Sequence, residues 1–266
     1  MQADINEVSL AFDDTGSGPA VILIHGFPLC RRMWRPQTKA LTEAGFRVVA
    51  PDLRGFGESS APAGPYSMSL FADDIIGLMD HLGLAQAVIG GMSMGGYVLF
   101  NLLERYPGRA AAALFLVTRA GGENEEGRTN RTRMAHAVAE EGPGVVTKVF
   151  SELVFADGTA ERRPELVAQA RGWMEAATPH GLEGALLAMR DRKDFMPDLA
   201  LLDVPALVVG AEKDRAIPLE QSRRIAAGLP RATFRSIPEA GHLANLEQPE
   251  AFNRCLVDYL QNLHLR

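Results

Sequence analysis

Short apolar runs alternate along most of the chain with segments that place apolar side chains at helical spacing. The apolar runs have the length and β-branched content of buried strands and lie at residues 20–24, 46–50, 85–89, 111–117, 205–210 and 232–237. Predicted helices cover about residues 34–43, 69–82, 97–106 and 249–263. Because strands joined by helices form parallel sheets, the pattern predicts an α/β fold with a mostly parallel central sheet and helices on both faces.

The N-terminal region has a different pattern. Residues 7–12 alternate between apolar and polar side chains, residues 13–19 carry Asp, Gly and Pro as turns do, and residues 20–24 are uniformly apolar. This order predicts an antiparallel hairpin at the start of the sheet.

The alternation of strands and helices stops between residues 118 and 197. This block has no strand pattern, and its short amphipathic helices are separated by Gly- and Pro-containing turns. An all-helical block that interrupts an α/β pattern is typical of an insertion. We therefore expect a core of residues 1–117 and 198–266, with residues 118–197 forming a helical cap.

Composition narrows the class of protein. With 266 residues, 47% hydrophobic content and a formal net charge of -6, the chain can form one sizeable core and offers no basic surface for nucleic acid or anionic membranes. No apolar run reaches the length of a membrane span and no secretory leader is apparent, so we expect a cytoplasmic protein, either a monomer or a small homo-oligomer. Cys30 and Cys255 are too few for a disulfide framework or a zinc site. The pair Arg31-Arg32 is expected to be solvated.

The candidate chemistry centres on Gly91-Met92-Ser93-Met94-Gly95, which lies between a predicted strand and a predicted helix. A serine on such a sharp turn is exposed at the end of the strand, and a side chain at position 91 or 95 would collide with neighbouring backbone. Ser93 could instead be an ordinary helix N-cap. The strand-turn-helix context, with acid and histidine candidates downstream, favours a nucleophile.

Two later loops supply partners for Ser93. Asp214 and His242 each follow a late strand, and the order serine, acid, histidine is that of α/β-hydrolases. His242 would take the serine proton and Asp214 would orient the imidazole. Two other carboxylates are less suitable as the acid. Asp203 precedes its strand and so lies at the opposite end of the sheet, and Glu212 comes too early in its loop to reach inward.

Two backbone N–H groups could stabilise the oxyanion of an acyl-transfer reaction. They belong to Met94, at the helix start, and Phe27, in the loop His25-Gly26-Phe27-Pro28 after an early strand. For His25 itself, we expect a structural hydrogen bond.

Other charged side chains are interpreted as structural or solvated. Asp52 and Arg54 are expected to brace the glycine-rich loop of residues 51–59, and Asp73 and Asp74 to face solvent from their helix.

Taken together, these segments resemble the α/β-hydrolase superfamily. The resemblance is carried by His25-Gly26-Phe27-Pro28, Asp52-Leu53-Arg54-Gly55-Phe56-Gly57-Glu58-Ser59, Gly91-Met92-Ser93-Met94-Gly95-Gly96, Gly210-Ala211-Glu212-Lys213-Asp214 and Ala240-Gly241-His242-Leu243. Within the superfamily the chain is similar to small capped carboxylesterases, and more loosely to enol-lactone hydrolases and cofactor-free peroxidase-like esterases. One departure is Val117, where similar esterases often carry Asp, an alternative acid in some relatives.

The resemblance implies a serine esterase that cleaves short acyl esters through an acyl-enzyme on Ser93, with no metal or organic cofactor. Serine at this turn argues against dehalogenases and epoxide hydrolases of the same fold, which attack with Asp. Two alternatives remain open: a lactonase or carbon–carbon bond hydrolase with the same three residues, and a small-molecule receptor that has kept the fold.

Overall fold

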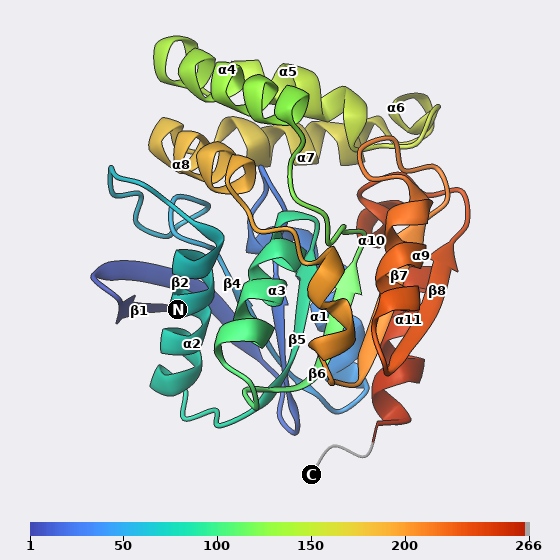
Figure 1. Ribbon diagram of the computed structural model, residues 1–266. Coiled ribbons are helices and arrows are strands. Elements are labelled where there is room, and N and C mark those ends of the chain that lie inside the picture. The colour runs from blue at the N-terminus through green and yellow to red at the C-terminus, as the bar shows by residue number, and fades with distance from the viewer. Residues whose placement is uncertain (264–266) are drawn as a thin grey trace.

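The central element of the fold is an eight-stranded sheet with strand order β1-β2-β4-β3-β5-β6-β7-β8. The computed structural model describes residues 1–263 (Figure 1), and the last three residues of the expected core segment 198–266 lie outside this range. The strands are β1 (Gln2–Ile5), β2 (Val8–Thr15), β3 (Ala20–Ile24), β4 (Arg47–Pro51), β5 (Ala87–Met92), β6 (Ala110–Leu116), β7 (Ala206–Ala211) and β8 (Ala232–Ile237). Neighbours from β4 to β8 are parallel, which confirms the predicted α/β architecture.

The predicted N-terminal hairpin is wrong in its partner. We expected β2 to pair with β3, but β4 lies between these two strands. β2 pairs antiparallel with β4 on one side and forms its hairpin with β1 on the other. β3 is apolar on both faces, so it needs a neighbour on each side, and the parallel strands β4 and β5 provide them. The alternation of residues 7–12 indicated a strand but contained no information about its partner.

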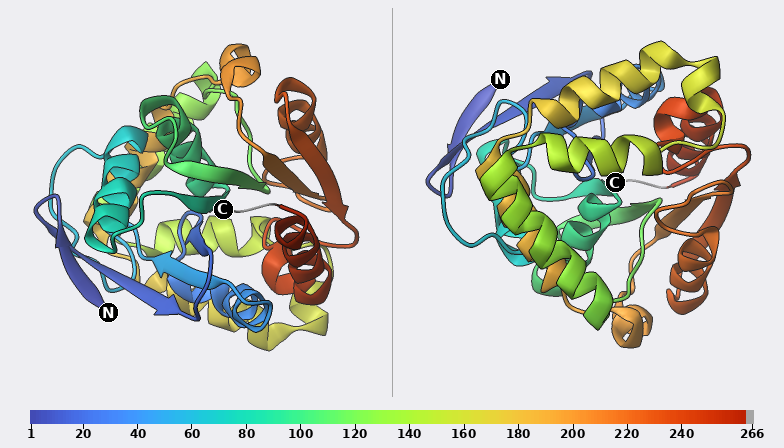
Figure 2. Two further views of the ribbon diagram at one scale, coloured as in Figure 1. Left: turned by 90° about the horizontal axis from the view of Figure 1, so that it is seen from below. Right: turned by 90° about the horizontal axis from the view of Figure 1, so that it is seen from above.

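Helices cover both faces of the sheet, as predicted. On one face, α2 (Met68–His81), α3 (Met94–Arg105) and α9 (Leu219–Gly228) contribute to one apolar cluster. On the other face, α1 (Arg35–Glu43) and α11 (Pro249–Gln261) contribute to a second cluster. Figure 2, seen from below, shows the sheet between these two layers.

The chain from β6 to β7 is helical and contains no strand in its described residues. It forms α4 (Glu125–Glu141), α5 (Gly144–Leu153), α6 (Thr159–Arg162), α7 (Pro164–Glu175) and α8 (Pro179–Arg190), followed by the 3₁₀ helix η2 (Met196–Leu201). Figures 1 and 2 show that α4, α5, α7 and α8 lie together above the carboxyl ends of the parallel strands. The remaining short helices are η1 (Arg31–Trp34) and α10 (Ala244–Glu247).

Side-chain caps explain where several of these helices begin. Ser67 accepts a hydrogen bond from Leu70 N (3.0 Å), Asn124 from Gly127 N (2.8 Å) and Thr178 from Gly181 N (3.0 Å). Each cap satisfies an N–H group that the first helical turn leaves free.

Two buried ion pairs brace the loop of residues 51–59. Asp52 accepts hydrogen bonds from Glu58 N (2.9 Å) and from the guanidinium of Arg31, which is itself buried. Arg54 donates from Nη2 to Asp74 Oδ1 (2.6 Å). The bracing role of Asp52 and Arg54 is confirmed, whereas the expectation that Arg31 and Asp74 are solvated is wrong. Their charges are buried because each meets an opposite charge.

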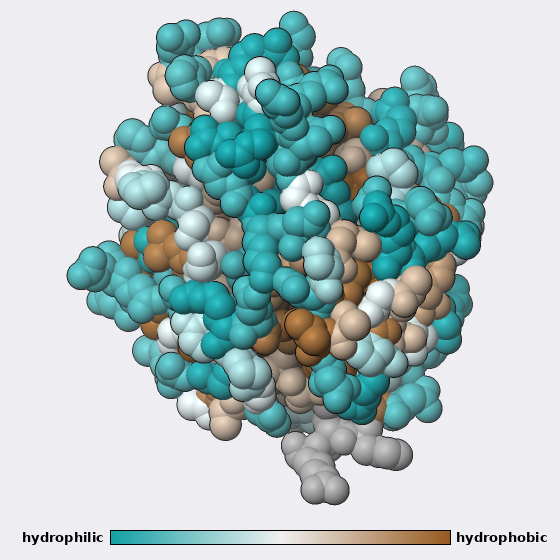
Figure 3. All heavy atoms as spheres, in the orientation of Figure 1, coloured by the Kyte–Doolittle hydropathy of each residue, from teal (hydrophilic) through white to brown (hydrophobic). Residues whose placement is uncertain are grey.

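The outer surface is largely hydrophilic on the face shown in Figure 3, with small hydrophobic patches between. Across residues 1–263, no helix is long and apolar enough to cross a membrane.

Candidate active site

Ser93 lies on a strained turn between β5 and α3. Its backbone angles are φ 53° and ψ -114°, in a region that side-chain-bearing residues rarely occupy. The turn is fixed on both sides, because Ser93 N donates to Leu116 O (3.0 Å) and Ser93 O accepts from Thr118 Oγ1 (2.8 Å). The side chain of this half-buried serine is therefore held at the carboxyl end of a central strand.

The flanking glycines are required by close backbone approach. A Cβ atom at Gly91 would lie 2.1 Å from Gly95 O, and one at Gly95 would lie 2.4 Å from Ile24 O. Neither neighbour is a flexible side chain that could move away. The predicted collision at these two positions is confirmed.

Asp214 and His242 are brought together by the loops after β7 and β8. His242 Nδ1 and Asp214 Oδ2 are 2.8 Å apart, and both residues are buried. The other carboxylate oxygen of Asp214 accepts from Ala216 N (2.7 Å) and Ile217 N (3.0 Å). Because the carboxylate can only accept, Nδ1 carries the proton and Nε2 of neutral His242 is left as a proton acceptor.

The Ser93 hydroxyl is expected to act together with Asp214 and His242. Within residues 1–263 it makes no hydrogen bond to another protein group, whereas the other two candidates are directly bonded. Nucleophile and base hydrogen bonds are often long in unliganded enzymes and tighten when substrate binds. The structure thus brings Asp214 and His242 together and leaves the serine hydroxyl without a protein partner.

The N–H groups of Phe27 and Met94 also have no protein acceptor among the described residues, although both residues are buried. Met94 opens α3, where N–H groups point out of the helix end and attract negative charge. Phe27 follows β3, and its ring contacts those of Phe56 and Phe150. Unpaired buried N–H groups are rare in proteins, so this pair is suited to an anionic oxygen.

The side chains that we set aside as catalytic candidates have other partners. His25 Nε2 accepts from Leu53 N (3.0 Å) and its Nδ1 lies 3.0 Å from Gly26 O, which confirms the expected structural hydrogen bond. Burial lowers the pKa of His25, so this imidazole is held neutral. Glu212 accepts from Ser236 Oγ (3.0 Å) and Asp203 lies 3.8 Å from Arg231, both at exposed positions.

Sequence reasoning missed Glu247, a buried carboxylate beside the histidine loop. It accepts from Gly241 N (2.7 Å), directly before His242, and from Ala156 N (3.0 Å) and Thr159 Oγ1 (2.6 Å). Glu247 therefore joins the loop that carries His242 to the segment between α5 and α6. The sequence offered no signal for this, because a single Glu before a predicted helix is common.

A small apolar cavity lies between α4, α5 and α8. Its volume is about 210 Å³, and its lining includes Arg131, Met134, Phe150 and Leu186. The ring of Phe150 is 5.2 Å from that of Phe27, so one wall of the cavity packs against the loop that carries a candidate oxyanion donor.

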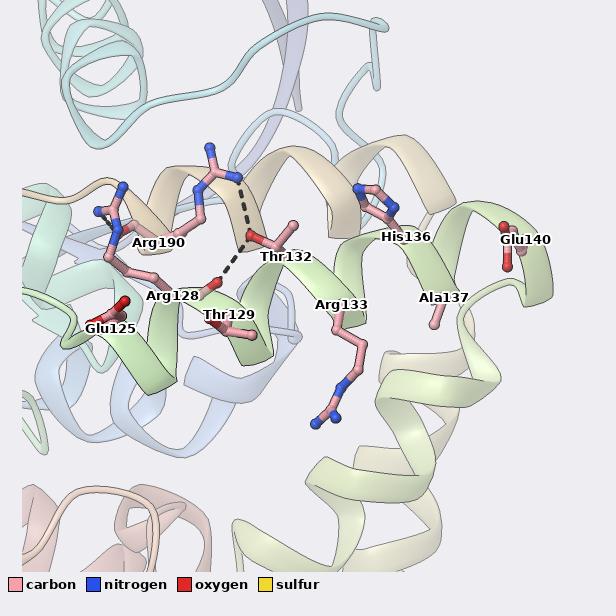
Figure 4. Close-up of a pocket in the computed structure, with 9 residues that line it drawn as sticks. All are labelled: Glu125, Arg128, Thr129, Thr132, Arg133, His136, Ala137, Glu140 and Arg190. Carbon is pink, nitrogen blue, oxygen red and sulfur yellow. Dashed lines mark hydrogen bonds between the residues drawn. The ribbon is translucent and has the colours of Figure 1, made fainter.

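A wider groove of about 760 Å³ runs along the outside of α4 and is lined mainly by polar and charged side chains (Figure 4). Arg128 and Arg190 lie together at one side of it, whereas Arg133 points the other way. Arg128 bonds Asp191 and Arg190 bonds both Asp191 and Thr132. In the part of the chain that the structure describes, His, Cys, Asp and Glu form no group of three or more that could hold a metal ion.

Comparison with known proteins agrees with the α/β fold described above. A family model described as alpha/beta hydrolase fold matches residues 19–249. A thermophilic esterase from Thermogutta terrifontis, solved with malate bound, is 38% identical with a TM-score of 0.96, covering 100% of this chain and 99% of that one. An enol-lactonase from Burkholderia xenovorans is 29% identical with a TM-score of 0.92, and the match covers 98% of this chain and 100% of the enol-lactonase. A bromoperoxidase from Bacillus anthracis is 26% identical with a TM-score of 0.89, and the match covers 98% of this chain and 99% of the bromoperoxidase.

Proposed function

The chain belongs to the alpha/beta hydrolase family, and we propose that within it the protein is a serine hydrolase that cleaves carboxylic esters with short acyl groups. The observation that carries the proposal is the buried hydrogen bond between His242 and Asp214, formed at the same end of the sheet as the strained turn of Ser93. Esterase and enol-lactonase structures among its relatives support the same class of reaction.

In the proposed first step, Ser93 Oγ attacks the ester carbonyl while His242 Nε2 takes the hydroxyl proton. Asp214 keeps Nδ1 protonated and stabilises the imidazolium that forms. The N–H groups of Phe27 and Met94 donate to the oxyanion, and each such donor contributes roughly 3 kcal/mol to stabilisation of the transition state.

Collapse of the tetrahedral intermediate releases the alcohol, which receives its proton from His242, and leaves an acyl group on Ser93. A water molecule that loses its proton to His242 then attacks the acyl carbon. This second attack releases the carboxylic acid and restores the serine hydroxyl, so the net reaction consumes one ester and one water.

We assign residues 118–197 as a cap that closes over this site. Helices α4, α5 and α8 surround the apolar cavity of about 210 Å³, and Phe150 connects that cavity to the Phe27 loop. A cavity of this size suits a short acyl or alcohol group.

The test is hydrolysis of 4-nitrophenyl esters from acetate to octanoate by the wild type and Ser93→Ala. We expect kcat/KM for the preferred short ester to fall by at least about a thousandfold in the variant, because the nucleophile is lost. Ser17→Ala, at an exposed turn serine, should retain wild-type rates. Equal rates for the wild type and Ser93→Ala would refute the assignment.

A lactonase is the second candidate, and the similarity to an enol-lactonase favours it specifically. Comparing kcat/KM on simple esters with that on lactones separates the two, because both reactions use the same three residues.

A further inference from the structure

A second group of buried and partly buried charges lies beside the proposed active site and takes no part in the chemistry described above. Glu123 accepts hydrogen bonds from Arg119 Nη2 (2.7 Å) and Arg192 Nη1 (2.8 Å), and also from Arg131 Nε. We call these four residues the Glu123 cluster. It joins the loop after β6 to α4 and to the chain after α8.

The cluster has more positive charge than its single carboxylate can neutralise. Burial opposes ionisation of Glu123, but Arg192 and Arg131 outweigh it and lower the pKa of Glu123 to about 2, so the group is ionised. The three guanidinium groups of the cluster then leave two positive charges in excess. The side chains of Arg192 and Glu123 are 2% and 7% exposed, and those of Arg131 and Arg119 are 19% and 27% exposed. Burial of unneutralised charge is costly, so an arrangement of this kind calls for an anion.

Two guanidinium N–H groups also lack an acceptor. Arg119 Nε and Arg192 Nη2 are buried and have no hydrogen-bond partner among residues 1–263. The Arg192 guanidinium lies over the ring of Tyr97, 4.5 Å from its centroid, a contact that uses the face of the group and supplies no in-plane acceptor. Buried donors without an acceptor are uncommon, and those on a cation are the most costly.

The cluster adjoins the proposed nucleophile through the backbone. Arg119 follows Thr118, whose hydroxyl bonds to Ser93 O, and Tyr97 lies one helical turn after Ser93 on α3. Arg131 lines the apolar cavity together with Phe150, whose ring contacts Phe27. The cluster therefore reaches the apolar cavity through Arg131, and the Phe150 wall of that cavity packs against the loop of the candidate oxyanion donor.

We propose that the Glu123 cluster binds a carboxylate group of the substrate, so that the preferred substrates are esters or lactones with a second, free carboxylate. This inference rests on the proposed function and adds the substrate class to it. Guanidinium groups bind carboxylates through charge-assisted hydrogen bonds, and Arg119 Nε and Arg192 Nη2 each have one N–H group to donate. The free carboxylate is not consumed, because hydrolysis breaks only the ester bond.

The first test compares two esters with the same leaving group, neutral 4-nitrophenyl butyrate and the anionic hemi-4-nitrophenyl glutarate. The measured quantity is the ratio of kcat/KM for the anionic ester to that for the neutral one. In Arg119→Met and Arg192→Met this ratio should fall by roughly tenfold or more from its wild-type value, the effect expected when a hydrogen bond between charged groups is lost.

Arg133→Met is the matched control. Arg133 lies on α4 like Arg131, is exposed, and points away from Arg190 (Figure 4), so its loss removes the same charge without touching the cluster. We expect the wild-type ratio in this variant. A ratio that falls equally in all three variants would reflect overall charge, and a ratio that falls in none would mean that the cluster is structural; either result overturns the proposal.

A binding measurement separates this inference from the proposed esterase activity. In Ser93→Ala, glutarate should raise the thermal unfolding midpoint, glutaramide should not, and Arg192→Met should abolish the rise. This result would support the carboxylate site even if no ester were hydrolysed. Conversely, Ser93-dependent hydrolysis without any effect of glutarate would leave the proposed function intact and refute the site, as would stabilisation by inorganic phosphate alone.

Discussion

Two arginine clusters lie near the carboxyl ends of the strands, and they differ in how their charges are neutralised. In the first, the buried Arg31 meets the fully buried Asp52, while Asp13 and Glu58 add half-exposed carboxylates at the rim. In the Glu123 cluster, one carboxylate meets three guanidinium groups, and two N–H donors have no acceptor. In the first cluster the protein itself supplies the carboxylates that pair with the arginine, as expected of a structural brace. In the Glu123 cluster it supplies fewer carboxylates than guanidinium groups, as expected of a site that binds an anion.

The largest expected effect tests the first cluster. Asp52→Asn removes the fully buried counter-charge of Arg31 and leaves it only the half-exposed Asp13 and Glu58, so we expect the free energy of unfolding to fall by about 3 kcal/mol. Urea unfolding monitored by circular dichroism measures this change. Asp13→Asn, at the exposed rim of the same cluster, should lose no more than about 1 kcal/mol. Similar values for both variants would mean that burial does not distinguish the two pairs.

A smaller effect on stability, and one that depends on pH, is expected from His25, which links strand β3 to the loop braced by Asp52. Burial lowers the pKa of His25 below the usual 6.5, so below that pH the unfolded chain binds a proton that the folded protein does not. Stability from this group is therefore complete above pH 6.5 and is lost as the pH falls toward the folded-state pKa, by at most about 1.4 kcal/mol per pH unit.

Urea unfolding between pH 7.5 and 5.0 measures this dependence. The slope of unfolding free energy against pH should be smaller in His25→Asn than in the wild type, and His136→Asn, at an exposed position on α4, should keep the wild-type slope. If His25→Asn also kept that slope, His25 would not be the group that loses its proton on folding.

The smallest expected change in stability tests the Glu123 cluster. Burial lowers the pKa of Arg192, so its charge is unfavourable where it lies, and removal of one guanidinium brings the cluster closer to neutrality. We expect Arg192→Met to change the free energy of unfolding by less than about 1 kcal/mol. Urea unfolding at pH 7 checks this. A loss comparable to that of Asp52→Asn would show that the two clusters are equivalent braces.

Local patterns in the sequence predicted the sheet, its helices and the residues that meet at its edge. Gly91 and Gly95 identified the turn of Ser93 because a side chain at either position would collide with backbone. Gly91 lies against Gly95 in the same turn, and Gly95 lies against Ile24 at the end of β3. Asp214 and His242 could be paired because parallel strands end at the same edge.

Charge partners could not be predicted where neither a motif nor the order of the strands brings their segments together. Asp74 looked solvent-facing because its burial depends on Arg54, and Arg31 looked solvated because Asp52 lies in another loop. Glu247 accepts hydrogen bonds from two chain segments, and Glu123 accepts them from three. Hydrophobic periodicity carries no information about such charge pairing, so these groups required the three-dimensional structure.

The central claim is that Ser93 is a nucleophile activated by His242. The most direct measurement is reaction with a fluorophosphonate, which modifies activated serines irreversibly, followed by peptide mass spectrometry. We predict a single adduct on Ser93 in the wild type and none in His242→Ala. An adduct on a different serine, or equal labelling of Ser93 in both proteins, would contradict the account.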